Sequence, residues 1–335
     1  MSNSDWDISD DAAALHDRAV ICNTTLKSIV SLGAEQLGET LPRYLASGFT
    51  YVSLTVGLDE TPLQETVLYC ARERRRYKNS KDYIFVETVD DILRAKKEGK
   101  LAVGFHFQGS NPLMSELAMV ELYYNLGIRH MVMVFNHKNP VGDGCLERTD
   151  GGLSQYGIRL IEEMNRVGIM VDCTHAGYTT SMEAMDVSKE PVIFSHCNVL
   201  GLRDHQRNIR DDQITACAKT GGVIGISGIA RFMADPQDDS TEKFFEHIDY
   251  VTNLVGPEHV CIGLDHNYSL TTRHKYYEDN PHLLSKDDPN FPFKYVQPEQ
   301  FPKLTEMMLK NGYNETDVEG ILGENFLRVA RQVWK

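Results

Sequence analysis

The feature that most restricts the fold of this chain is a regular alternation of short apolar runs with longer amphipathic segments. Each run is nearly continuous in apolar residues, as strands covered on both faces must be. Segments of ten or more residues separate the runs, and this spacing is typical of βαβ units around a parallel sheet. The eight expected strands lie at 19–25, 49–57, 101–107, 129–135, 168–173, 191–196, 222–227 and 260–265.

Eight strands, each followed by a helix, predict an α/β fold of the (β/α)8 TIM-type barrel class. Helices are expected near 34–46, 61–76, 89–98, 113–126, 153–167, 178–187, 212–219 and 241–255. No internal repeat or interdomain linker stands out, so we expect residues 1–335 to form a single barrel domain. Its predicted additions are a lead-in at 1–18, an aromatic lid loop at 266–295 and helices at 298–333 that pack on the barrel.

Charge and the N-terminal sequence restrict the partners. The formal net charge of −14, from 48 acidic and 34 basic residues, argues against nucleic acid or an anionic membrane and leaves a small-molecule substrate. The first residues lack the basic and apolar regions of a signal peptide, and no stretch approaches eighteen apolar residues. The seven cysteines are an odd number without a C-x-x-C pair, which indicates reduced thiols. We therefore expect a soluble, cytoplasmic protein without a membrane partner.

Polar residues end several of the apolar runs. His175 follows the fifth expected strand, His196 ends the sixth and Asp265 ends the eighth. The carboxyl ends of barrel strands converge on one mouth, so these side chains are expected to meet there, and two imidazoles with a carboxylate suit a divalent ion such as zinc. The alternative is that each is only a hydrogen-bonded polar residue at a strand end. Of the arginines after the sixth strand, one could bind a substrate carboxylate, or all could simply be exposed.

The chain resembles the membrane dipeptidase (renal dipeptidase) family of the amidohydrolase superfamily from about residue 14 to residue 333. The stretches that carry the resemblance are LYYNLGIRHMVMVFN (122–136), GDGCLERTDGGLSQYG (142–157), EEMNRVGIMVDCTHAG (162–177), PVIFSHCNV (191–199), DHQRNI (204–209), GGVIGI (221–226) and IGLDHN (262–267). The resemblance implies a (β/α)8 barrel, a homodimer, and two zinc ions bridged by a water that attacks a dipeptide amide.

Four positions match the family's site residues. By this resemblance, His175 and His196 bind one zinc, and Asp265 binds the other and accepts the proton of the water. Arg207 corresponds to the arginine that binds the substrate's C-terminal carboxylate.

Other positions depart from the family pattern. The family's first strand ends with His-x-Asp, both ligands of the first zinc, and those places align with Thr24 and Leu26. Gln108 stands in the place of the glutamate that bridges the two metals, and Phe135 in that of a histidine that polarises the scissile carbonyl. Because Gln is neutral and Leu has no lone pair, we expect one tightly bound metal ion rather than two.

His106 lies two residues before Gln108, so the two share a strand face. It is either a replacement ligand beside His175 and His196 or a packing residue. The leading functional hypothesis is a metal-dependent hydrolase that cleaves an amide or related bond in a small substrate, with Asp265 as catalytic base and Arg207, Phe135 and Gln108 contacting the substrate. One alternative is a barrel that only binds a small molecule, and another is a metal-dependent lyase or isomerase.

Overall fold

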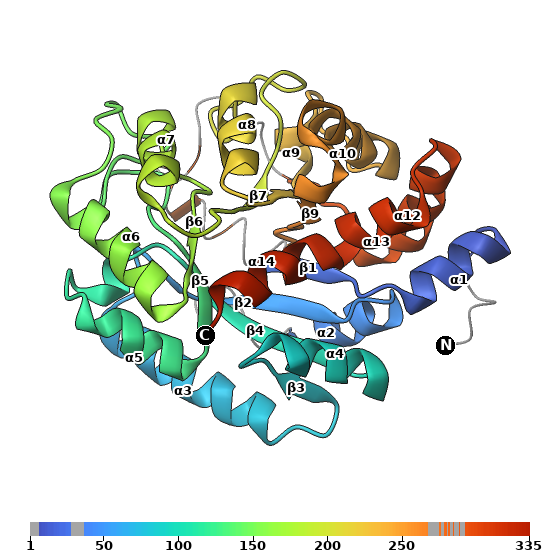
Figure 1. Ribbon diagram of the computed structural model, residues 1–335, viewed down its shortest axis with the longest axis horizontal. Coiled ribbons are helices and arrows are strands. Elements are labelled where there is room, and N and C mark those ends of the chain that lie inside the picture. The colour runs from blue at the N-terminus through green and yellow to red at the C-terminus, as the bar shows by residue number, and fades with distance from the viewer. Residues whose placement is uncertain are drawn as a thin grey trace.

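The computed structural model describes residues 7–27, 37–266 and 292–335, together with Lys275, Glu278, Asp279, Pro281, Leu284 and Asp288. Most of the predicted lid loop at 266–295 therefore lies outside the described residues. Within them, eight parallel strands form the barrel predicted from the sequence (Figure 1). These are β1 (Cys22–Lys27), β2 (Tyr51–Leu58), β4 (Leu101–Gln108), β5 (Ile128–Val132), β6 (Met170–Asp172), β7 (Phe194–Cys197), β8 (Ile224–Ile226) and β9 (Val260–Ile262).

Two isolated bridges close the ring of strands. The ladders run β1-β2-β4-β5-β6 in one sheet and β7-β8-β9 in the other. A parallel bridge between Asp172 and Ile193 joins β6 to the chain entering β7, and another between Leu26 and His266 joins β1 to the chain leaving β9. All carboxyl ends of the strands therefore face the same mouth.

Helices surround the barrel and pack on one another in chain order: α3 on α5, α5 on α6, α6 on α7, α7 on α8, α8 on α10 and α10 on α12. An apolar face explains several of these helices, and some begin at a side-chain cap; Ser154, for example, accepts a hydrogen bond from the Gly157 N–H at the start of α6. The α-helices are α1 (Asp10–Arg18), α2 (Leu37–Ala46), α3 (Leu63–Lys78), α4 (Val89–Glu98), α5 (Ala118–Leu126), α6 (Gln155–Val167), α7 (Tyr178–Val187), α8 (Asp211–Lys219), α9 (Ala230–Met233), α10 (Thr241–Val255), α12 (Phe301–Lys310), α13 (Glu315–Glu319) and α14 (Asn325–Val333). Short turns are η4 (Asn111–Leu113), η5 (Pro257–His259), η7 (Pro298–Gln300) and the π-turn η8 (Gly320–Glu324).

The C-terminal helix α14 covers the end of the barrel opposite the mouth. Phe326, Leu327 and Val333 form one apolar cluster with residues that begin the strands, among them Cys22, Tyr51, Ala102, Met170 and Cys261. Figure 1 shows α14 crossing this end of the strands. The C-terminal helix α14 thus packs on the barrel as predicted and covers the amino ends of the strands. The mouth at their carboxyl ends is not covered by this helix.

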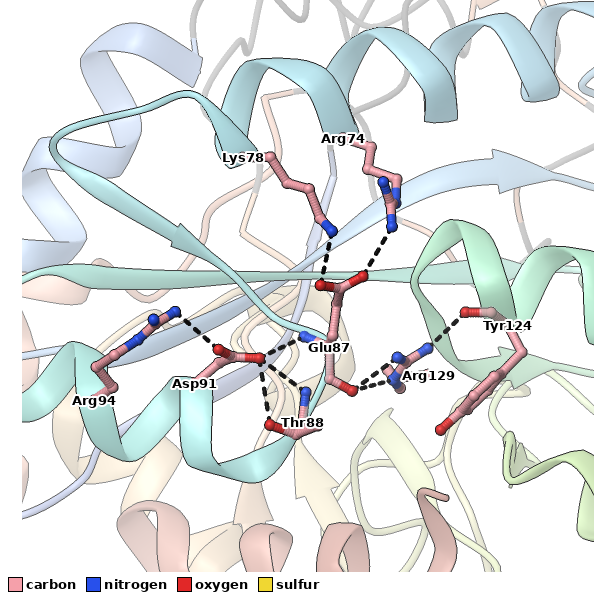
Figure 2. A network of polar contacts seen from close by, with 8 residues as sticks. All are labelled: Arg74, Lys78, Glu87, Thr88, Asp91, Arg94, Tyr124 and Arg129. Atoms are coloured by element: carbon pink, nitrogen blue, oxygen red, sulfur yellow. Dashed lines mark hydrogen bonds and ion pairs between the residues drawn. The ribbon is translucent and has the colours of Figure 1, made fainter.

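A short extra strand, β3 (Tyr83–Phe85), pairs with the first half of β4, while β5 pairs with the second half. A polar network holds the segment after β3 in place (Figure 2). The Glu87 carboxylate contacts Arg74 and Lys78 of α3 at 2.8 and 2.7 Å, and the Glu87 carbonyl accepts two hydrogen bonds from Arg129 of β5. The network ties α3, β3 and β5 together far from the site residues.

None of the described helices is long and apolar enough to span a membrane.

Candidate active site

The predicted site residues come from the carboxyl ends of the strands. His196 lies in β7, His175 follows β6 by three residues, and Asp265 follows β9 by three residues. Arg207 lies in the loop between β7 and α8. His175 and Arg207 line a cavity of about 330 Å³, together with Cys145, Tyr178 and Arg210.

The two histidines face each other across the mouth. Their Nε2 atoms are 3.0 Å apart, and both side chains are buried. Two imidazole nitrogens bound to one tetrahedral zinc, each at about 2.0–2.1 Å, would lie about 3.3 Å apart. The observed distance suits one cation held by both rings, or an N–H···N hydrogen bond between them.

Hydrogen bonds to the other ring nitrogens orient both imidazoles. His175 Nδ1 lies 2.6 Å from Asn136 Oδ1, an acceptor, so its lone pair is on Nε2. His196 Nδ1 lies 2.8 Å from Ser195 Oγ and 3.1 Å from Thr25 Oγ1. Burial, followed by the positive charges of Arg207 and Lys27, holds the pKa of His196 well below its usual value. His196 is therefore neutral and able to act as a ligand.

Three residues of the mouth have left-handed backbone conformations. The φ angles are 61° at Asn136, 68° at His175 and 47° at Asp265. Such conformations are uncommon for residues other than glycine and gather at functional sites.

A bulge in β1 decides which of its side chains reach the mouth. Asn23 pairs with Val52 and Leu26 with Leu54, so β1 contains one more residue than β2 over this interval. Thr24 Oγ1 lies 2.6 Å from the Ser195 carbonyl oxygen and Leu26 belongs to the apolar core, whereas Thr25 contacts His196. The residues of β1 that reach the site are consequently Thr25 and Lys27, rather than the aligned pair Thr24 and Leu26.

Lys27 ends β1 as a buried cation beside Asp265. Lys27 Nζ is 3.4 Å from Asp265 Oδ2, and the two side chains are only 7% and 3% exposed. The Asp265 backbone N–H donates to the Thr25 carbonyl, which holds the Asp265 main chain against β1. Asp265 Oδ1 is buried and has no hydrogen-bond partner among the described residues.

Arg207 contacts one histidine of the pair and Phe135 contacts the other. Arg207 is almost fully buried, donates from Nη2 to the His196 carbonyl at 3.3 Å, and stacks over Phe232. The Phe135 ring packs against His175, with 4.3 Å between centroids. Phe135 also belongs to an apolar cluster at the mouth with Leu58, Ile229, Phe232, Phe293 and Tyr295.

His106 and Gln108 contact β2 inside the barrel. His106 Nδ1 is 2.9 Å from Ser53 Oγ, and its Nε2 is 2.9 Å from Thr55 Oγ1. The His106 ring stacks on His130 at 4.4 Å. Gln108 Nε2 also donates to Thr55, while Gln108 Oε1 is buried without a partner among the described residues.

The donor set does not fit a two-metal centre. Thr25 and Lys27 end β1, and Gln108 ends β4, so no carboxylate from these strands is present to bind or bridge two ions. Within the described residues, no three His, Cys, Asp or Glu side chains group together closely enough to hold a metal. The Nε2 atoms of His175 and His196 are close enough together to bind one ion between them.

Sequence reasoning missed Lys27, Thr25 and Asn136 as parts of the site. The available signal for Lys27 was a charged residue directly after the buried run CNTTL. The bulge could not be seen in the sequence, because CNTTLK has no alternating apolar pattern that would show which of its residues face inward.

Comparison with known proteins agrees with this architecture. Residues 24–280 match the model of the family described as membrane dipeptidase (peptidase family M19). The chain is 34% identical to an uncharacterized dipeptidase of Schizosaccharomyces pombe over 265 residues, which are 77% of this chain and 58% of that protein. The chain thus spans well under two thirds of the length of this curated relative.

Solved structures are similar over nearly the whole chain. An amidohydrolase from Pseudomonas aeruginosa has a TM-score of 0.87 at 32% identity, with 96% of this chain and 99% of that chain covered. The probable dipeptidase PvdM, also from Pseudomonas aeruginosa, has a TM-score of 0.80 over 97% and 98% of the two chains, and at 17% identity it supports the fold alone. The family match over most of the chain and the relatives above 30% identity lead to one conclusion: the chain belongs to the membrane dipeptidase family of metallopeptidases.

Proposed function

We propose that the protein is a hydrolase that cleaves an amide or related bond in a small, carboxylate-bearing substrate with at most one tightly bound divalent ion. The observation that carries this proposal is the pair of Nε2 atoms, 3.0 Å apart, with Arg207 close behind His196. The pair can hold a cation, and the arginine can hold an anion, beside a cavity large enough for a small molecule.

His175 and His196 would hold the ion, and zinc is among the ions that imidazole nitrogens suit. When bound, such an ion lowers the pKa of its water toward neutrality and polarises a carbonyl group. Asn136 and Ser195 keep the two rings in position through Nδ1. Asp265, with Oδ2 beside Lys27 and Oδ1 without a hydrogen-bond partner among the described residues, accepts a proton on Oδ1 and returns it to the leaving group.

Arg207 would bind the substrate carboxylate through its guanidinium group, as planar N–H donors match two carboxylate oxygens. Phe135 and its apolar cluster favour a substrate side chain less polar than that of most dipeptides. Gln108 offers its amide oxygen, which has no partner in the part of the chain that the structure describes, to a polar group of the substrate.

The test is a panel of dipeptides, N-acyl amino acids, esters and lactones, each assayed after chelation and again with added Zn²⁺. We expect hydrolysis of carboxylate-bearing compounds and a large loss of rate when the carboxylate is amidated. Complete inertness toward every class, with and without metal, would contradict the proposal.

A barrel that only binds a small molecule is the second candidate. The replacement of ligand-type residues at the ends of β1 and β4 by Thr25, Lys27 and Gln108 favours it. Elemental analysis of protein purified without chelator separates the two, since binding alone requires no stoichiometric transition metal.

We also propose a cytoplasmic homodimer. Seven free cysteines support a reducing compartment, and the resemblance to the family supports the dimer. Light scattering coupled to gel filtration tests the assembly, and a monomeric mass would refute it.

A further inference from the structure

The end of β1 carries a positive charge where the family pattern calls for a metal-binding pair. The family's His-x-Asp residues are two apart and must share a strand face. In this barrel the two residues of β1 with that spacing and with contacts in the mouth are Thr25 and Lys27. By its spacing and contacts Lys27, rather than the aligned Leu26, is the candidate for the position of the carboxylate ligand, with the opposite charge.

We propose that Lys27 is a built-in cation that takes the place of the second metal ion of the family site and holds Asp265 as its counter-ion. The proposal rests on the proposed function for its chemical meaning, but the metal count it predicts does not depend on any substrate. It assigns Lys27 a positioning role, since its ammonium group acts on Asp265 and need not contact the reacting atoms.

The burial of Lys27 explains why an ammonium group can stand in place of a metal ion beside Asp265. A lysine side chain that is 7% exposed requires a compensating negative charge, and Asp265 supplies it at 3.4 Å. An ammonium group has three donors and no lone pair, so it repels a divalent ion instead of binding it. Arg207 Nη2 contacts the His196 carbonyl, and Thr25, two residues before Lys27 on β1, contacts His196 Nδ1, so both cations come from segments beside the histidine pair.

The ion pair also explains why the two oxygens of the Asp265 carboxylate have different surroundings. Its Oδ2 faces Lys27, and its backbone N–H donates to the Thr25 carbonyl of the same strand. Only Oδ1 is left without a partner among the described residues. A carboxylate anchored through one oxygen presents the other in a fixed position, which is what a second metal ion would otherwise achieve.

The experiment restores the family pattern at β1. The full-length chain and the double variant Thr25→His/Lys27→Asp are stripped with chelator, titrated with Co²⁺ and Zn²⁺, and analysed for bound metal by mass spectrometry and visible absorption. We expect the unaltered protein to take up at most about one equivalent tightly and the double variant about one more, because the variant adds an imidazole and a carboxylate.

Two single variants serve as controls. Lys27→Gln removes the charge without adding a strong ligand and should gain no metal. Lys96→Met, at a half-buried lysine at the opposite end of the barrel that donates to the Asp17 carbonyl, should match the unaltered protein in metal content and in hydrolysis.

Two tightly bound ions in the unaltered protein would overturn the proposal, and that measurement needs no variant. A double variant with unchanged circular dichroism and no added metal would overturn it as well. Once a substrate is known, Lys27→Arg should retain at least about tenfold more kcat/KM than Lys27→Gln, because only the charge is required. Failure of the proposed function would instead appear as absence of hydrolysis with the metal counts as expected.

Discussion

Asn136 Oδ1 lies 2.6 Å from His175 Nδ1, and both residues have positive φ angles, 61° and 68°. The contact joins the loops that follow β5 and β6. Two unfavourable backbone conformations are thus maintained on the two sides of one hydrogen bond. Its chemical consequence is that the His175 lone pair is held on Nε2, toward His196.

Removal of this hydrogen bond should weaken metal binding without unfolding the protein. Asn136→Gly deletes the side chain, and glycine accepts the positive φ without strain. We expect metal affinity to fall by about 10- to 100-fold, the usual effect of losing a partner that orients a ligating histidine. Isothermal titration with Zn²⁺ measures this. Asn136→Asp, which keeps an acceptor oxygen, is the matched control and should bind metal at least as well as the unaltered chain.

Substitution of Arg207 should act mainly on substrate binding. Arg207→Lys keeps the charge but loses the planar pair of donors, so we expect KM for carboxylate substrates to rise about tenfold or more with a smaller change in kcat. Steady-state kinetics on a substrate and on its C-terminal amide measure this effect, because the rise in KM should be seen with the carboxylate and not with the amide. Arg210→Lys is the control, because Arg210 lines the same cavity but stacks on Tyr178. Equal effects of both variants would assign no specific role to Arg207.

His106→Ala should leave the metal content unchanged. Both ring nitrogens of His106 already contact hydroxyl groups of Ser53 and Thr55 at 2.9 Å. The variant should lose about 2–4 kcal/mol of stability, from the cavity and from the two unpaired hydroxyls. Denaturant unfolding and elemental analysis are both needed. A fall in stoichiometric metal in folded variant protein would show that His106 is a ligand.

The fold could be predicted because parallel strands covered on both faces have a continuous apolar signal. Each of the eight expected runs overlaps a barrel strand, and α4, α7 and α10 have the expected bounds. The three-residue β3 was missed because its pattern, YIF, is too short to differ from a loop. Its position depends on the contacts of Glu87 with α3 and β5, which no local pattern reveals.

The site was predictable only in part, for a geometric reason. Barrel topology predicted that His175 and His196 meet at the strand ends, and their Nε2 atoms lie 3.0 Å apart. Arg207 was assigned by the family resemblance, and it lies beside the His196 carbonyl. Thr25 and Lys27 were not predicted, since the bulge after Asn23 changes which residues face inward. Asn23 Oδ1 supports that bulge by accepting hydrogen bonds from the backbone N–H groups of Thr25 and Leu264. Leu264 is 241 positions away from Asn23 in the sequence.

A buried histidine far from the mouth should make stability depend on pH. His16 Nδ1 lies 2.7 Å from Thr305 Oγ1 of α12, and its Nε2 lies 3.0 Å from the Ser47 carbonyl oxygen. Burial lowers the pKa of His16 from 6.5 to about 4 in the folded protein. Between these two values the unfolded chain binds a proton that the folded chain does not, so the free energy of unfolding must fall as pH decreases through this window. The loss attributable to His16 is about 3 kcal/mol and is complete below the lower value.

His16→Gln keeps a donor for Ser47 and has no proton to gain, so its melting temperature should depend less steeply on pH between 6.5 and 4. Thermal unfolding followed by circular dichroism across this range gives both slopes, and measurement at pH 8 isolates the cost of the changed contacts. Parallel pH profiles for the two proteins would mean that His16 does not contribute to acid sensitivity.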